Sequence, residues 1–243
     1  MKVAVVGAKG RMGSAVCEAV EAAGMDLVAR LDAGDEITAQ RLAGADVVVE
    51  FTVPSATDAN VHAILDAGAH VVVGTTGWTE ERLAAVREHA QRVGKNALIA
   101  PNYALSAVLA MAFAEKAAAM FESVEVIELH HPDKVDAPSG TATTSAHRIG
   151  AVRKAAGLVS PDNTQSDPLG TRGGVIDGVQ VHAVRLRGLY AHEEILFGNP
   201  GEQLTIRQDS FGRESFMPGI LLAIRKVGQR PGLTYGLEPL LDL

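Results

Sequence analysis

The sequence predicts an α/β protein, built from a doubly wound parallel sheet and a second domain with a mixed open sheet. Through the first hundred residues, short apolar runs alternate with helix-length amphipathic segments, which is the pattern of parallel βαβ units. After about residue 178, three strand-like segments follow one another without an intervening helix, which favours antiparallel pairing. We expect one domain of residues 1–103 plus 213–243 and a second of residues 104–212.

Composition excludes several classes of protein. The 243 residues are 47% hydrophobic and 21% charged, with a mean hydropathy of +0.12, so the chain is long and apolar enough for two modest domains. The net charge of −7 makes nucleic acid an unexpected partner. The single Cys17 excludes an intrachain disulfide, and no apolar stretch is long enough to cross a bilayer. We therefore expect a cytoplasmic protein with no membrane contact.

The N-terminus carries a glycine-rich turn between a strand and a helix. Lys2–Val6 is an apolar run of buried-strand type, residues 7–13 read GAKGRMG, and a helical pattern continues to about Ala23. Such a turn lets a pyrophosphate approach backbone N–H groups. Its position after the first strand predicts a Rossmann-type dinucleotide site.

Asp32 follows the second predicted strand, Leu27–Leu31, about twenty residues beyond the turn, where a carboxylate would bond adenosine ribose hydroxyls. That favours NADH. Lys9 and Arg11 offer positive charge to a 2′-phosphate, so use of both NADH and NADPH is expected. The alternative for Asp32 is a simple turn or cap residue.

Further strands are expected at residues 46–51, 70–73 and 96–100, with helices at 52–67 and after Thr79. Ligands of doubly wound sheets bind beyond the carboxyl ends of the strands. Four segments fall at such ends and predict the cofactor-binding residues, which are Gly7, Ala8, Lys9, Gly10, Arg11, Met12, Asp32, Gly74, Thr75, Thr76, Ala100, Pro101, Asn102 and Tyr103.

The second half predicts a helix at 104–121, a long polar loop at 157–174 and strands at 179–186, 192–197 and 202–209. A helix at 215–227 and a tail from residue 233 are expected to return to the first domain and complete its sheet.

Residues 125–142, EVIELHHPDKVDAPSGTA, combine a strand, a loop and a helix start. Alternation places Glu128 and His130 on one face of the strand and His131 on the other, a spacing that does not suit chelation of one metal ion. Ser139 opens a helical pattern that runs to about residue 156. A helix N-terminus beside a His and a Lys can receive a carboxylate or phosphate and supply a proton and a positive charge. A surface His-His pair without function is the alternative.

These motifs resemble those of the dihydrodipicolinate reductases, also called 4-hydroxy-tetrahydrodipicolinate reductases, of bacterial lysine and diaminopimelate synthesis. The family signature E-[IV]-x-E-x-H-x-x-x-K followed by D-x-P-S-G-T-A is met in full within residues 125–142. The GAKGRM turn, the GTTG loop and the PNY loop match in order, with Tyr103 where Phe is commoner.

The resemblance implies an NAD(P)H-dependent reductase acting on a small cyclic dicarboxylate, with His130 as proton donor and Lys134 as a second acid or cationic helper. It implies substrate contacts at His131, Ser139, Gly140 and Thr141. It also implies a homotetramer assembled through the sheet of the substrate-binding domain. From strand geometry, we infer that Glu128 orients or tunes His130, and a plain surface or hinge carboxylate is the alternative. An aspartate-dehydrogenase-like enzyme and a catalytically idle nicotinamide-binding sensor are the alternatives.

Overall fold

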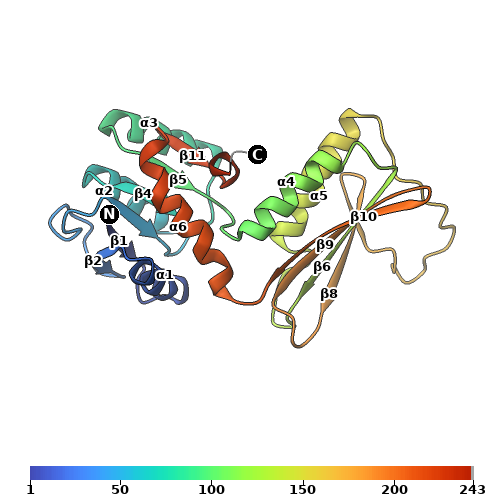
Figure 1. The fold of residues 1–243 in the computed structure, drawn as a ribbon, viewed down its shortest axis with the longest axis horizontal. Coiled ribbons are helices and arrows are strands. Elements are labelled where there is room, and N and C mark those ends of the chain that lie inside the picture. The colour runs from blue at the N-terminus through green and yellow to red at the C-terminus, as the bar shows by residue number, and fades with distance from the viewer. Residues whose placement is uncertain (242–243) are drawn as a thin grey trace. The chain divides into compact units, whose positions relative to one another are not determined.

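Short apolar segments form a six-stranded parallel sheet in the N-terminal part of the chain (Figure 1). A computed structural model of the protein describes residues 1–241. The strand order is β11-β5-β4-β3-β1-β2 and every neighbouring pair is parallel. Its strands are β1 (Lys2–Val6), β2 (Asp26–Leu31), β3 (Val47–Glu50), β4 (His70–Val73), β5 (Ala97–Ile99) and β11 (Leu233–Tyr235).

Helices cover both faces of this sheet, as the doubly wound fold requires. The helix α1 contacts α6, while α2 contacts α3. Valine and isoleucine side chains of the central strands are fully buried between the layers because both sheet faces are covered. The helices are α1 (Arg11–Ala22), α2 (Thr57–Asp66), α3 (Glu80–Val93) and α6 (Met217–Lys226), with short 3₁₀ turns at Arg213–Phe216, Val227–Gln229 and Glu238–Leu240.

The second sheet is mixed and has five strands in the order β10-β9-β6-β8-β7. The pair β6 and β8 is parallel and the other pairs are antiparallel. The strands are β6 (Ser123–His130), β7 (Gly174–Ile176), β8 (Val179–Arg185), β9 (Ala191–Asn199) and β10 (Glu202–Ser210). The helices α4 (Leu105–Ala117) and α5 (Gly140–Ala155) pack together on one face of this sheet (Figure 1).

The chain divides into two compact units, Met1–Ala104 together with the chain from Arg213 onward, and Leu105–Gly212. The expected α/β class, with one parallel and one mixed sheet, is confirmed. Element ends differ from expectation by a few residues. The largest difference is at α2, which begins at Thr57 rather than at residue 52, because Thr52 bonds Glu50 and Thr75 instead of entering the helix.

Candidate active site

Glu128 is the centre of a buried polar cluster at the end of β6. Its side chain is fully buried, and each carboxylate oxygen accepts two hydrogen bonds. Arg185 on β8 donates from Nη2 to Oε1 and from Nη1 to Oε2, both at 2.8 Å. The backbone N–H of Ser139 donates to Oε1 at 3.1 Å, and His130 Nδ1 lies 2.5 Å from Oε2. With two donors on each oxygen, the carboxylate accepts as many hydrogen bonds as its lone pairs allow.

This cluster follows from strand geometry. Glu128 and His130 are two residues apart on β6 and so share a face. The parallel register of β6 and β8 places Arg185 directly opposite His130, and the loop after β6 brings Ser139 back over the same end of the sheet.

The ionisation of the pair is set by opposing effects. Burial alone would raise the pKa of Glu128, but the hydrogen bonds from Arg185 and His130 outweigh it and hold that pKa below 4.5. Burial lowers the pKa of His130 below 6.5, although Glu128 acts in the opposite direction. Because Glu128 is ionised and accepts only, Nδ1 of His130 is the donor, which leaves Nε2 to carry a transferable proton.

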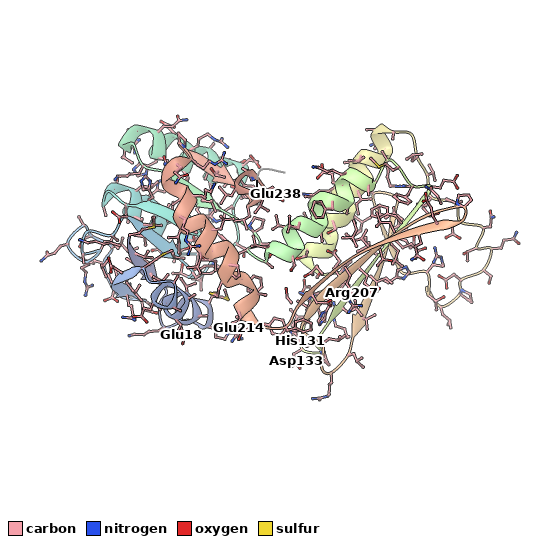
Figure 2. The ribbon with its side chains drawn as sticks, in the orientation of Figure 1. Glu18, His131, Asp133, Arg207, Glu214 and Glu238 are labelled. Carbon is pink, nitrogen blue, oxygen red and sulfur yellow. The ribbon has the colours of Figure 1, made fainter. Side chains whose placement is uncertain are left out.

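Lys134 lies in the loop between β6 and α5. Its Nζ donates to Asp136 at 2.7 Å, and this contact lowers the pKa of the Asp136 carboxyl. The backbone of the same segment is held by Arg185, which donates from Nη2 to the Asp136 carbonyl at 2.8 Å. His131 is half-buried and its ring lies 6.3 Å from that of Tyr190. Figure 2 shows His131 and Asp133 together at one end of this unit.

The helix α5 begins as expected. Ser139 is its N-cap, and the Ser139 hydroxyl accepts from the N–H of Ala142 at 3.2 Å. Gly140 is exposed and Thr141 half-buried, so the first turn of α5 offers its positive dipole end beside His130 and Lys134. This end of the unit can take up an anionic group and supply a proton to it.

Two glycines of the glycine-rich turn in the other unit have no room for a side chain. A Cβ on Gly7 would lie 2.0 Å from the Phe51 carbonyl oxygen, and one on Gly13 would lie 2.0 Å from the Gly7 carbonyl oxygen. Gly7 also has φ +85°, which favours glycine. In the part of the chain that the structure describes, no side chain caps the N-terminus of α1. The turn thus presents backbone N–H groups at the point between β1 and β3 where the strand order reverses, and these features suit a pyrophosphate.

Asp32, directly after β2, is hydrogen-bonded to the backbone of this turn. Its Oδ2 accepts from the Lys9 N–H at 2.6 Å and its Oδ1 from the Ala33 N–H at 2.8 Å. These backbone bonds lower the pKa of the Asp32 carboxyl, with the Ala33 bond the larger cause. The carboxylate oxygens retain capacity for further donors such as ribose hydroxyls.

The remaining predicted cofactor residues lie on the ends of β4 and β5. A Cβ on Gly74 would overlap the Phe51 ring at 2.0 Å. Thr75 is buried and donates to Glu50 at 2.8 Å. Tyr103 is buried, and its hydroxyl donates to the Val73 carbonyl at 2.7 Å, so it supports the end of β4. Ala100 is buried, Thr76 and Pro101 are exposed and Asn102 is half-buried.

Arg185 and Glu50 have no counterpart among the sequence-predicted residues. Arg185 lies 55 residues beyond His130 in a strand with no motif around it, and only the β6–β8 register brings the two together. Glu50 is fully buried and accepts from the hydroxyls of Thr57 and Thr75, each at 2.8 Å. A carboxylate at the end of an otherwise apolar strand was the available signal for Glu50.

Two family models match this chain over nearly its whole length. The model described as dihydrodipicolinate reductase, N-terminus, matches residues 1–103, and the one described as dihydrodipicolinate reductase, C-terminus, matches residues 106–241.

The chain belongs to the dihydrodipicolinate reductase family.

Relatives of this reductase family agree over full length. The 4-hydroxy-tetrahydrodipicolinate reductase of Beutenbergia cavernae is 59% identical over 247 residues, covering 100% of this chain and 99% of that protein. The enzyme of the same name from Bifidobacterium longum is 61% identical and covers 100% of both. The dipicolinate-bound dihydrodipicolinate reductase from Paenisporosarcina sp. TG-14 superposes with a TM-score of 0.88 at 36% identity, over 98% of each chain. An amine dehydrogenase from Mycobacterium smegmatis, at 13% identity and a TM-score of 0.64, shares the fold.

Among residues 1–241, no group of three His, Cys, Asp or Glu side chains is arranged to hold a metal ion. Within the same range, no helix combines the length and apolarity needed to span a bilayer.

Proposed function

We propose that this reductase acts in the diaminopimelate route to lysine, where 4-hydroxy-tetrahydrodipicolinate loses water to give dihydrodipicolinate, and the enzyme uses NADH or NADPH to reduce dihydrodipicolinate to tetrahydrodipicolinate. The observation that carries the proposal is the Glu128–His130 pair, fixed by Arg185 at the N-terminus of α5. In a chain of this family, that arrangement supports a proton donor beside an anion-binding helix end. The names of the full-length relatives support the same substrate.

The substrate is a ring with two carboxylates. The Lys134 ammonium and the first turn of α5, with Ser139, Gly140 and Thr141, are the groups proposed to hold one carboxylate. His131, in the same loop, is proposed as a further contact. The dipicolinate bound to the Paenisporosarcina enzyme is a pyridine dicarboxylate of the same chemical class, which supports this assignment.

His130 is the proposed proton donor. Reduction adds a hydride to one carbon of the conjugated ring and a proton to its neighbour, so one acid is needed. Glu128 holds Nδ1, so Nε2 of the imidazolium delivers the proton. Burial keeps the pKa of His130 low in the free enzyme, and a bound dianion opposes this effect by favouring the imidazolium. Substrate binding and protonation of the donor are therefore coupled.

The nicotinamide supplies the hydride when it is bound. The proposed contacts are the N–H groups of the glycine-rich turn for the pyrophosphate and Asp32 for the adenosine ribose. Lys9 and Arg11 are exposed beside this turn and are proposed to accept a 2′-phosphate. Residues 74–76 and 100–103 are proposed to line the nicotinamide end. We expect both NADH and NADPH to serve.

The proposal is tested by following NADH and NADPH oxidation with substrate made freshly by the preceding synthase from pyruvate and aspartate semialdehyde. Rapid oxidation that depends on this substrate is expected, with both cofactors active. Oxidation of aspartate instead would identify an amino-acid dehydrogenase. Tight cofactor binding without turnover of either substrate would identify a sensor, and both results would overturn the proposal.

A further inference from the structure

A second buried carboxyl group lies beside the Glu128 cluster. Glu193 on β9 is the direct antiparallel partner of Glu128 on β6, so their side chains share the helix-covered face of the sheet. Glu193 is only 2% exposed. Its Oε2 accepts from the Ser145 hydroxyl on α5 at 3.2 Å, and its Oε1 is buried with no hydrogen-bond partner among residues 1–241.

The surroundings of Glu193 do not compensate a negative charge. Arg185 directs its hydrogen bonds to Glu128, which is itself an anion, and to the backbone carbonyls of Val184 and Asp136. The residue opposite Glu193 on β10 is the uncharged Gln208, α4 contributes Ser106, whose hydroxyl bonds Gln208 at 3.5 Å, and α5 contributes Ser145. An ionised Glu193 would therefore place two anions side by side in a buried row, in which the Arg185 guanidinium is bound to Glu128 and the titratable His130 lies beyond Glu128.

We propose that Glu193 is a neutral carboxylic acid below neutral pH and acts as a positioning residue that titrates as a coupled pair with His130 through Glu128. Burial, with the Glu128 charge adding to it, raises the pKa of Glu193 to about 7, which is close to the range in which an imidazole titrates. The two groups then release their protons in two steps that belong to the pair.

The coupling has a definite sign. When Glu193 loses its proton, the new negative charge favours the imidazolium, so His130 keeps its proton to higher pH than it would beside a neutral neighbour. Glu193 thus extends the alkaline side of the range in which the donor is charged. This role rests on the proposed function of His130, whereas the coupling itself does not.

The decisive variant is Glu193→Gln, which keeps size and polarity but stays neutral at every pH. In the full-length wild type, infrared spectroscopy should show the carbonyl stretch of a protonated carboxyl group below neutral pH, and this band should be missing from Glu193→Gln. With ¹⁵N-labelled histidine, the His130 resonance, assigned with His130→Gln, should titrate with an upper midpoint about 0.5 to 1 pH unit lower in Glu193→Gln. The alkaline limb of kcat should move down by a similar amount, while kcat below pH 6 changes less than about twofold.

The matched control is Glu194→Gln, the same change one residue along β9 on the opposite face, where Glu194 pairs with Arg207. It should leave the infrared band and the His130 titration at wild-type values. If Glu193→Gln does not fold, Ser145→Ala serves instead: it removes a hydrogen bond that stabilises the carboxylate, so the protonated band should persist to higher pH.

A His130 titration unchanged by Glu193→Gln, or a wild-type band that survives the substitution, would overturn the inference. Both readings are made on the protein without substrate. If the protein shows the coupling but lacks reductase activity, the inference about Glu193 stands and the proposed function is wrong.

Discussion

At the residue scale, Glu128 and His130 form a hydrogen-bonded pair in which hydrogen bonds keep Glu128 ionised despite its burial, whereas burial lowers the pKa of His130. The fully buried Glu128 stays charged because it accepts four hydrogen bonds, two of them from the Arg185 guanidinium. Truncation of either member would leave its partner's polar atoms buried without their bonds, which is costly. The pair is therefore suited to hold one imidazole in one orientation.

Replacing His130 by Gln should lower kcat by about 10²- to 10⁴-fold, because the general acid is lost. Cofactor affinity should stay near wild type, since the predicted cofactor residues lie in the other unit. Steady-state kinetics and nicotinamide fluorescence titration measure the two quantities. His147→Gln is the control, because His147 on α5 is exposed and bonds Asp177. Full activity in His130→Gln would exclude His130 as the donor.

The raised pKa of Glu193 also predicts how the stability of the protein depends on pH. Its folded pKa of about 7 lies above the ordinary value of 4.5, so the folded state retains a proton that the unfolded state has released. The free energy of unfolding of the wild type, compared with that of a variant whose side chain at position 193 stays neutral, therefore falls as pH rises from about 4.5 to about 7. The total change is about 3 kcal/mol.

The measurement is urea unfolding of wild type and Glu193→Gln at pH 5 and pH 8. The difference in free energy of unfolding, Glu193→Gln minus wild type, should be about 2–3 kcal/mol more positive at pH 8 than at pH 5. An equal difference at both pH values would mean that Glu193 ionises normally.

At the scale of the element, α5 combines a structural cap with a proposed binding end. The Ser139 hydroxyl caps the helix, and its backbone N–H reaches Glu128. Thr79 caps α3 in the same way in the other unit, through the N–H of Arg82. Removing either cap should destabilise its helix by a similar amount, so Thr79 serves as a control for Ser139.

Ser139→Ala and Thr79→Ala should each cost about 1 kcal/mol of stability. Only Ser139→Ala should raise the substrate KM, because only α5 is proposed to bind the substrate. Thermal unfolding and steady-state kinetics give both values. An unchanged KM in Ser139→Ala would mean that the Ser139 cap does not contribute to substrate binding.

The turn before α1 depends on close backbone approach. Gly13→Ala should weaken cofactor binding by about tenfold or more and destabilise the protein by about 1–3 kcal/mol, since the new Cβ would overlap the Gly7 carbonyl oxygen. Isothermal titration with NADH measures the affinity. Gly198→Ala is the control, because open space surrounds Gly198, and it should bind NADH normally. Unaltered binding by Gly13→Ala would mean that the turn is not the pyrophosphate site.

At the scale of the whole molecule, the mixed sheet has one face covered by α4 and α5 and another that carries Ile127, Leu129, Val184 and Leu196 by alternation along the strands. Each of these four side chains is only partly buried. We propose that this face joins subunits of a homotetramer, as the family resemblance implies.

Leu196→Glu should break the assembly, because it places a charge in the middle of the proposed interface. Light scattering after size-exclusion chromatography measures the mass, with a tetramer expected for wild type and smaller species for the variant. Met120→Glu, at a position that is 72% exposed, should stay tetrameric. A wild-type monomer, or a Leu196→Glu tetramer, would contradict the proposed interface.

The sequence was sufficient for the fold class because hydrophobic periodicity distinguishes βαβ units from successive antiparallel strands. It also indicated that Glu128 and His130 share a strand face, since that depends only on alternation. The contribution of Arg185 depends on which strand lies beside β6 and in what register, and a shift of one residue would turn Arg185 to the other face. Neither that register nor the burial of Glu50 and Glu193 follows from local sequence.

The pairing of β11 with β5 also has a consequence for biosynthesis. Leu233 pairs with Ala97, and the Asn96 side chain bonds the backbone of Val227 and Gly232, so the parallel sheet is finished by the last part of the described chain. Leu105–Gly212 precedes those residues in the chain, so it emerges from the ribosome before they do. Because domains fold as units during translation, the unit that carries His130 can reach its native state while the nucleotide-binding sheet still has an open edge at β5. Nascent chains that stop at residue 212 and carry a C-terminal linker long enough to clear the ribosome should therefore already contain the Glu128–Arg185 pair.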